Sequence, residues 1–172
     1  YFKFEEKDIA EIVALYIPKI KDKEYDGQKF LSACLQFSFS SPKILETILE
    51  EVSLEKISEA IQHLYFNNET GLIKKTIKIL LEHGKHTKSI LAVYAKVLFE
   101  GGNYKLGMDI VNRILVDYKD IGLCLGLISF MDDETKDDHS KKLNKIFADI
   151  NTYDKLRFLK ITRQHDLMIE LI

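Results

Sequence analysis

The chain has 172 residues, of which 25 are basic and 27 acidic, so its formal net charge is −2. Charges this evenly balanced create no overall field that would hold nucleic acid or an anionic membrane without specificity. Hydrophobic residues make up 46% of the chain, which is ample for one continuous core without disulfides or metals.

Cysteine usage and the lengths of the apolar runs bear on the compartment. Cys34 and Cys124 each lie in an apolar helical run, where reduced cysteines usually occur, so we expect an intracellular protein of the cytoplasm or nucleus. The longest apolar run, Ile121 to Met131, is too short to cross a bilayer, so we expect no membrane insertion. Because the chain begins at Tyr1 instead of methionine, we interpret it as a fragment of a larger protein.

Apolar residues recur at helical spacing along almost the whole chain, and only 2 prolines and 8 glycines interrupt them. This pattern predicts an all-α chain of about eleven helices joined by short turns. Ser53 and Thr87 are expected to cap helix starts, and Gly84 is expected to end a helix. In chain order, the apolar residues of the expected helices lie within 5–21, 26–38, 42–52, 57–65, 72–81, 90–99, 105–118, 121–131, 143–150 and a final pair within 154–172.

The expected hairpins recur at a nearly constant interval. The first helices of successive pairs are expected to begin near Leu54, Lys88, Asp120 and Asp154, at separations of 34, 32 and 34 residues. A period near 34 is the signature of helix-turn-helix repeats. We therefore expect a single helical-repeat domain over residues 1–172, in which 1–53 form N-terminal helices and 54–172 form the hairpin repeats.

The best-preserved unit runs from residue 90 to residue 118. Its first helix alternates large and small apolar residues, its turn reads Gly-Asn-Tyr, and a small residue follows in the second helix. The matching positions are Leu91, Tyr94, Ala95 and Leu98, then Gly102, Asn103 and Tyr104, then Gly107. This unit resembles a tetratricopeptide repeat, although Ile114 stands where the family usually has alanine and Lys119 stands where it has proline.

The resemblance implies a right-handed array of helical hairpins, an α-solenoid, whose first helices line a concave groove. Such a groove would bind an extended peptide or a partner helix. In this register Lys96, Phe99 and Glu100 would face the groove, and we interpret them as candidate partner-binding residues. Structural alternatives stay open: Phe99 could pack against the next hairpin, and Lys96 and Glu100, four residues apart, could form a surface ion pair.

The motifs of nucleotide binding, zinc proteases and hydrolase nucleophiles are not found in the chain. The segment 101–103 joins two expected helices instead of a strand and a helix, so it is interpreted as a turn and not a phosphate-binding loop. His83 and His86 lie three residues apart, but nothing nearby completes a set of metal ligands. We therefore expect no enzyme activity, no cofactor and no metal site.

Two charge clusters are candidates for electrostatic contacts with a partner, although most such clusters are solvated faces. The basic cluster lies within residues 74–88. The acidic cluster lies in residues 132–138 and is expected to form a turn between helices. The functional alternative is that opposite potentials at opposite ends of the array orient a charged partner or stack two copies. The candidate residues are Lys74, Lys75, Lys78, Asp132, Asp133 and Glu134.

Together these patterns favour a non-catalytic scaffold that binds another protein or a peptide through a groove, within a larger complex. One alternative is RNA binding by pentatricopeptide-like hairpins, which the net negative charge and the confinement of excess lysine to one segment disfavour. A second alternative is the peptide-sensing repeat domain of a bacterial regulator. The sequence leaves the identity of the partner and the oligomeric state open.

Overall fold

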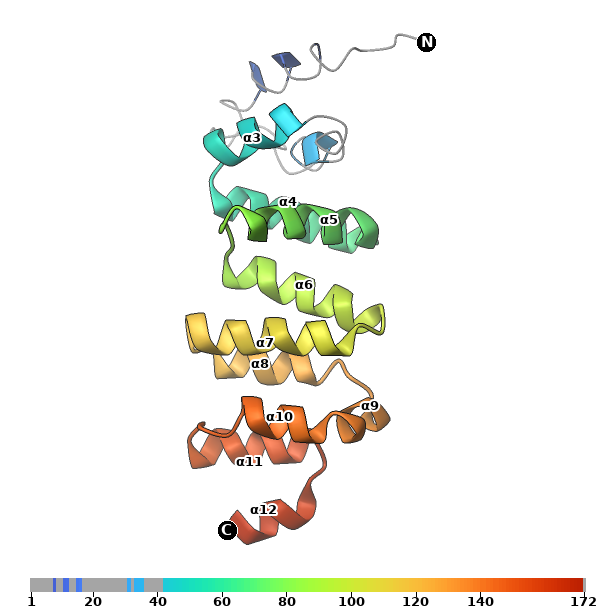
Figure 1. The fold of residues 1–172 in the computed structure, drawn as a ribbon, viewed down its shortest axis with the longest axis vertical. Coiled ribbons are helices and arrows are strands. Elements are labelled where there is room, and N and C mark those ends of the chain that lie inside the picture. Colours follow the sequence, from blue (N-terminus) through green and yellow to red (C-terminus); the bar gives the residue numbers. More distant parts are fainter. Residues whose placement is uncertain are drawn as a thin grey trace. The chain divides into compact units, whose positions relative to one another are not determined.

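Every secondary-structure element in the described part of the chain is a helix. The computed structural model describes residues 42–171 and nine earlier positions, at 8, 11, 12, 15, 16, 31, 33, 34 and 35. No strand occurs among these residues, so the expected all-α class is confirmed (Figure 1). The helices are α3 (Pro42–Glu51), α4 (Leu54–Phe66), α5 (Thr70–Glu82), α6 (Lys88–Glu100), α7 (Tyr104–Tyr118), α8 (Ile121–Ile128), α9 (Asp133–Asp138), α10 (Ser140–Ile146), α11 (Thr152–Ile161) and α12 (His165–Leu171).

Helix starts follow the capping residues expected from the sequence. Ser53 caps α4, because its side chain accepts a hydrogen bond from the Lys56 amide at 3.4 Å. Thr87 acts in the same way on α6, where its hydroxyl accepts from the Ile90 amide at 3.3 Å. The helices expected at 5–21 and 26–38 lie mostly outside the described residues, and the nine described positions within them are helical.

The acidic segment forms a helix, α9, and not the expected turn. The carboxylate of Asp132 accepts hydrogen bonds from the Thr135 amide at 2.7 Å and from the Thr135 hydroxyl at 2.9 Å. Asp133 and Glu134 then occupy the first turn, where the positive end of the helix dipole stabilises negative charge. The prediction of a turn is wrong because a capping carboxylate followed by acidic residues starts a helix.

Several helices end in the same hydrogen-bonded turn, the Schellman motif. In each one a residue in the left-handed conformation follows the helix, and the next amide donates to the carbonyl five residues earlier. The left-handed residues after α4, α5, α6 and α11 are Asn68, Gly84, Gly102 and Arg163. The first residues of α4 and α6, and likewise those of α5 and α7, are 34 positions apart. Along the chain, these two helix pairs therefore have the spacing that the sequence predicts.

The chain divides into two compact units, Tyr1–Ile90 and Leu91–Ile172, and the boundary falls inside α6. In the first unit α4 packs against α5. Each of the two helices contributes apolar residues at positions i, i+4 and i+7, so that one stripe faces the other. These residues are at most 1% exposed, and they are Ile57, Ile61 and Leu64 on α4 and Ile73, Ile77 and Leu80 on α5.

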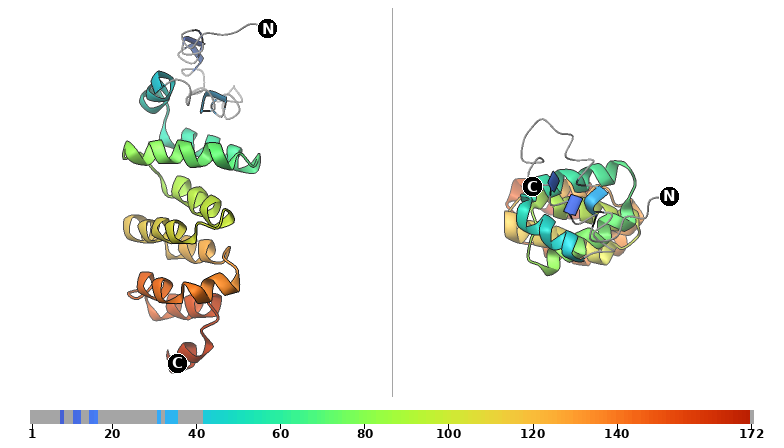
Figure 2. Two further views of the ribbon diagram at one scale, coloured as in Figure 1. Left: turned by 45° about the vertical axis from the view of Figure 1, so that its right-hand side comes forward. Right: turned by 90° about the horizontal axis from the view of Figure 1, so that it is seen from above.

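In the second unit α7, α8, α10 and α11 run in alternating directions and pack in two layers (Figures 1 and 2). α8 contacts both α7 and α11. α10 is joined to α7 by Lys142, whose ammonium donates to the Lys105 carbonyl at 3.0 Å and to the Asp109 carboxylate at 2.6 Å. Phe147, which follows α10, stacks on Phe158 of α11 with ring centroids 4.8 Å apart. α7 and α10 therefore form one layer, and α8 and α11 form the other.

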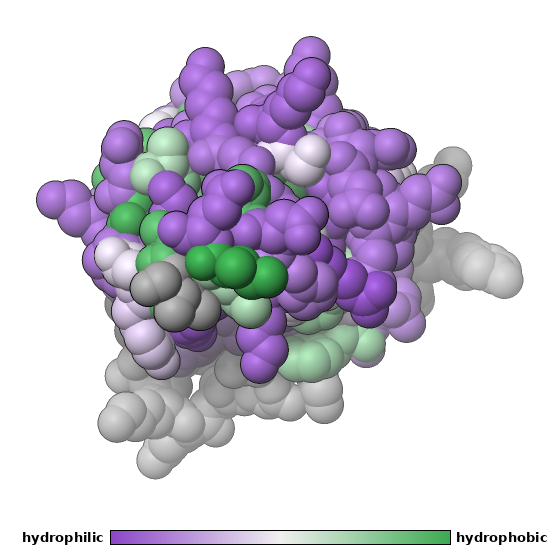
Figure 3. All heavy atoms as spheres, turned by 90° about the horizontal axis from the view of Figure 1, so that it is seen from below, coloured by the Kyte–Doolittle hydropathy of each residue, from purple (hydrophilic) through white to green (hydrophobic). Residues whose placement is uncertain are grey.

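Beyond α11, the second unit ends with α12, which is short and exposed. No described residue of α12 is buried, and Leu167 and Ile169 are 43% and 72% exposed. A hollow of about 390 Å³ lies between α12, α11 and the end of α10. Apolar side chains are visible among polar ones when the molecule is seen from below (Figure 3). The apolar lining of the hollow includes Phe147, Phe158, Leu159, Leu167 and Leu171.

Candidate binding surface

Lys96 of α6 and Phe130 form a cation–π pair in the second unit. The Lys96 ammonium lies 4.9 Å from the centroid of the Phe130 ring, and Phe130 is 54% exposed. This distance is within the range in which the ring attracts a cation. The pair therefore presents an aromatic surface and a positive charge side by side.

Phe130 was not among the residues expected from the sequence, for a physical reason. The apolar pattern predicts one helix through Met131, which would make Phe130 part of a continuous apolar run. In the structure α8 ends at Ile128, so Phe130 lies in the connection that leads to α9. The only signal in the sequence is its place between an apolar run and the acidic segment.

Phe99 packs inside the α6–α7 hairpin and is only 3% exposed. Its ring stacks on Tyr104, with centroids 6.3 Å apart and planes 24° apart. It also covers Gly107, where an added Cβ would lie 2.6 Å from Phe99 Cδ1. Gly107 is therefore the point of close approach of the two helices, and contact between Phe99 and a partner would require the hairpin to open.

The other two members of the expected trio lie nearer to solvent. Lys96 is half-buried, and Glu100 is exposed at the last residue of α6. The structure thus separates Phe99 from Lys96 and Glu100, and it brings Phe130 beside Lys96. The aromatic ring beside Lys96 is therefore that of Phe130, whereas Phe99 is buried in the hairpin.

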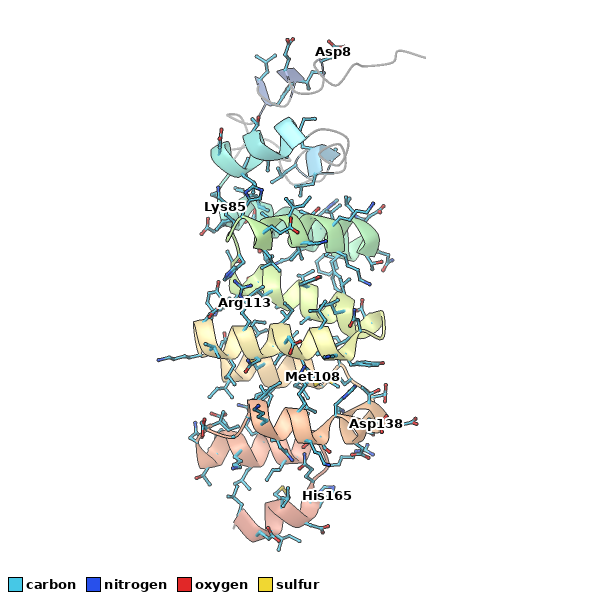
Figure 4. The ribbon with its side chains drawn as sticks, viewed as in Figure 1. Asp8, Lys85, Met108, Arg113, Asp138 and His165 are labelled. Atoms are coloured by element: carbon cyan, nitrogen blue, oxygen red, sulfur yellow. The ribbon has the colours of Figure 1, made fainter. Side chains whose placement is uncertain are left out.

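The acidic candidates Asp132 and Asp133 are engaged within the second unit. Hydrogen bonds from the Thr135 amide and hydroxyl, with one from Tyr104, lower the pKa of Asp132. Asp133 forms ion pairs with Lys136 at 3.2 Å and with Arg163, after α11, at 2.7 Å. These two carboxylates hold α9 and its neighbours in place. Asp132 is nevertheless exposed, as are Glu134, Asp137 and Asp138, the last of which is labelled in Figure 4.

The basic candidates lie on α5 in the first unit. Lys75 and Lys78 are exposed, and Lys74 is half-buried. Lys85, which belongs to the same basic stretch, is occupied: its ammonium donates to the Leu49 carbonyl at 2.5 Å, in the last turn of α3 (Figure 4). A cation at the C-terminal end of a helix is stabilised by the helix dipole. Part of the expected basic surface therefore has a structural role.

Both thiols are buried. Removal from water raises the pKa of Cys34 and that of Cys124 to about 12 in each case. The Cys124 thiol also donates to the Val111 carbonyl at 3.5 Å. A nucleophilic or redox thiol requires a lowered pKa and access to solvent, so neither cysteine has the properties of a reactive site.

We expect the folded chain to react with a maleimide at about pH 8 at less than ~1% of the rate of the urea-unfolded chain, because only a thiolate reacts. Folding raises the pKa of each thiol, so burial of the neutral thiols favours the folded state. This contribution to stability is present below about pH 9 and is lost as the pH rises toward 12. Mass spectrometry of timed samples would measure the rate, and Cys34→Ala would isolate Cys124. Rapid labelling of the folded Cys34→Ala variant would contradict the burial of Cys124.

Within 42–171 and the nine earlier positions, no three His, Cys, Asp or Glu side chains gather as they would to hold a metal ion. None of the described helices combines the length and the apolar character that crossing a bilayer requires.

Comparison of the chain with protein-family models, with curated proteins and with solved structures finds no match. The resemblance to tetratricopeptide repeats therefore rests on the central unit and on the spacing of the helices.

Proposed function

We propose that the chain is a non-catalytic helical-hairpin repeat domain that binds a peptide or a helix of a partner protein. The 34-residue spacing of α4 with α6, and of α5 with α7, supports the repeat. The Gly107 crossing supports the tetratricopeptide-like form of the α6–α7 hairpin, because this family keeps a small residue there.

The observation that carries the proposal is the exposed ring of Phe130 with the Lys96 ammonium over it. Aromatic and cationic side chains are enriched among the residues that dominate binding energy at protein interfaces. Lys96 comes from α6 and Phe130 follows α8, which are consecutive first helices in the proposed array. A ligand that contacts both would therefore lie across the first helices, as the groove model requires.

The layers of the second unit support the same face. α8 contacts α11, whereas α7 and α10 form the other layer. In the proposed array α6, α8 and α11 are the first helices of successive hairpins. A peptide bound to Phe130 would continue along this layer, and the exposed aromatic ring would be its anchor.

The experiment is a selection of peptides from a random library on the 172-residue chain, followed by titration of the best peptide against variants. We expect Phe130→Ala and Lys96→Met each to raise the dissociation constant at least about tenfold, because each removes part of one anchor. Val116→Ala is the matched control, since Val116 is 65% exposed on α7, in the other layer.

The control variant should bind as the unmodified chain does, and circular dichroism should be the same for all three. A selected peptide that binds Phe130→Ala and the unmodified chain equally would overturn the assignment of this surface. Failure to select any peptide would count against the proposed function as a whole.

A further inference from the structure

An acidic face follows Phe130 along the chain. Glu134, Asp137 and Asp138 are exposed at positions i, i+3 and i+4 of α9, so they share one side of this helix, which we call the acidic face of α9. Lys136, which lies between them in the sequence, is buried. Figure 4 shows Asp138 pointing away from the neighbouring helices. α9 therefore turns its lysine inward and three of its carboxylates toward solvent.

The three carboxylates of this face are not neutralised by ion pairs within the described part of the chain. Lys136 and Arg163 pair with Asp133 of the same helix instead. Asp137 and Asp138 also lie in the last turn of α9, where the negative end of the helix dipole disfavours negative charge. These two residues therefore do not stabilise the helix that carries them, and such departures from a local rule are expected at functional surfaces.

The acidic face of α9 is within reach of a ligand that contacts the Phe130 ring. Glu134 follows Phe130 by four positions, and that length of chain spans at most about 14 Å. Asp138 is four residues further along α9, which adds about 6 Å. A segment of about seven extended residues is therefore long enough to contact both the ring and the three carboxylates.

We propose that the ligand of the surface formed by Phe130 and Lys96 is a basic segment of a partner protein, an inference that rests on the function proposed above. An apolar side chain of the ligand contacts the exposed part of the Phe130 ring, and its arginine or lysine side chains pair with the acidic face of α9. Complementary charges across an interface speed association and set specificity. The same carboxylates repel nucleic acid and acidic peptides, so charge selects one class of ligand.

The positive charge of Lys96 is compatible with a basic ligand. Its ammonium lies 4.9 Å from the centroid of the Phe130 ring, and an ammonium has three donors. Lys96 can therefore hold the ring and also donate to a backbone carbonyl of the ligand. One positive charge beside the ring does not offset the three negative charges of the acidic face, so the surface as a whole stays acidic.

The peptides selected from a random library on the 172-residue chain test the class of ligand. We expect arginine and lysine to be at least about twofold more frequent in them than in the unselected library, because basic residues gain from the acidic face. Replacing the basic residues of the best peptide by glutamine should raise its dissociation constant at least about tenfold. This comparison leaves the chain itself unchanged, so it does not depend on the stability of a variant.

A triple variant of the chain tests the same contact from the other side. Glu134→Gln, Asp137→Asn and Asp138→Asn together remove three charges and keep the shapes of the side chains. We expect the dissociation constant of the best peptide to rise at least about tenfold. It should also depend less on salt concentration than that of the unmodified chain, since salt screens pairs of exposed charges.

A second triple variant is the matched control, because it makes the same change in net charge at exposed acidic residues outside α9. Its substitutions are Glu82→Gln, Asp149→Asn and Glu170→Gln. The control should bind the best peptide as the unmodified chain does. Circular dichroism should be the same for both triple variants and for the unmodified chain.

The outcomes distinguish this inference from the proposed function. Selected peptides could lose binding to Phe130→Ala and yet show no enrichment in basic residues, or bind the α9 triple variant as tightly as the unmodified chain. Either result would overturn the basic ligand and leave the Phe130 surface in place. Failure to select any peptide would count against the proposed function and this inference together.

Discussion

Replacement of Gly107 by alanine is expected to lower the free energy of unfolding by about 2 kcal/mol, because a new methyl group would overlap the buried Phe99 ring. The ring is enclosed by Tyr104 and by the α6–α7 hairpin, so it has little room to move. Alanine favours the helical backbone over glycine by about 1 kcal/mol, which offsets part of the overlap. Urea denaturation followed by circular dichroism would measure the net loss.

Gly126→Ala is the matched control for Gly107→Ala. Gly126 is also inside a helix, α8, but an added Cβ there would have no neighbour within 4 Å. We expect this variant to be as stable as the unmodified chain, or more stable by up to about 1 kcal/mol, because only the helix propensity changes.

A double-mutant cycle would assign the effect to the ring. In a Phe99→Leu background, Gly107→Ala should cost less than it does alone, because the smaller side chain leaves space for the methyl group. If the two substitutions were additive, the close approach of Phe99 and Gly107 would not be the cause of the loss.

Lys119→Pro is the second substitution with a large expected effect, a loss of about 3 kcal/mol or more in the free energy of unfolding. Lys119 ends α7 in the left-handed conformation, with φ of 52°. Proline requires φ near −65° and would also remove the amide that donates to the Leu115 carbonyl at 3.1 Å. The proline that tetratricopeptide repeats usually carry at this position is therefore incompatible with this turn.

Lys119→Gly is expected to have the opposite effect on stability at the same position. Glycine adopts the left-handed conformation without the steric cost that a side chain brings, so stability should rise by about 1 kcal/mol. Both variants can be compared by urea denaturation. A neutral Lys119→Pro variant would show that the connection between α7 and α8 adopts another conformation in solution.

Local patterns of the sequence were sufficient to predict most helix ends. Ser53 and Thr87 cap α4 and α6 as expected, and Gly84 follows α5 in the left-handed conformation. The sequence also predicts the small residue at the helix crossing, Gly107. Each of these features depends on residues within a few positions of one another, so a linear pattern carries the information.

The candidate site was predicted less well. Phe99 and Phe130 are both aromatic residues near the end of an apolar run, and the sequence left open whether Phe99 contacts a partner or packs against the next hairpin. In the structure Phe99 is buried beneath α7, whereas Phe130 lies beside Lys96 with over half of its side chain exposed. Which ring reaches solvent depends on where α8 stops and on which helices pack together.

The sequence by itself determined that the described chain is helical, where most of its helices begin and end, and that α4 and α6 begin 34 residues apart. Only the tertiary structure decided which charges make contacts within the chain. Lys85 donates to the Leu49 carbonyl of α3, and Asp133 forms an ion pair with Arg163. It also decided that Lys155 and Glu170 share one hollow. The physical reason is that helix formation is governed by neighbours in the chain, whereas exposure and pairing are governed by side chains brought together from distant positions.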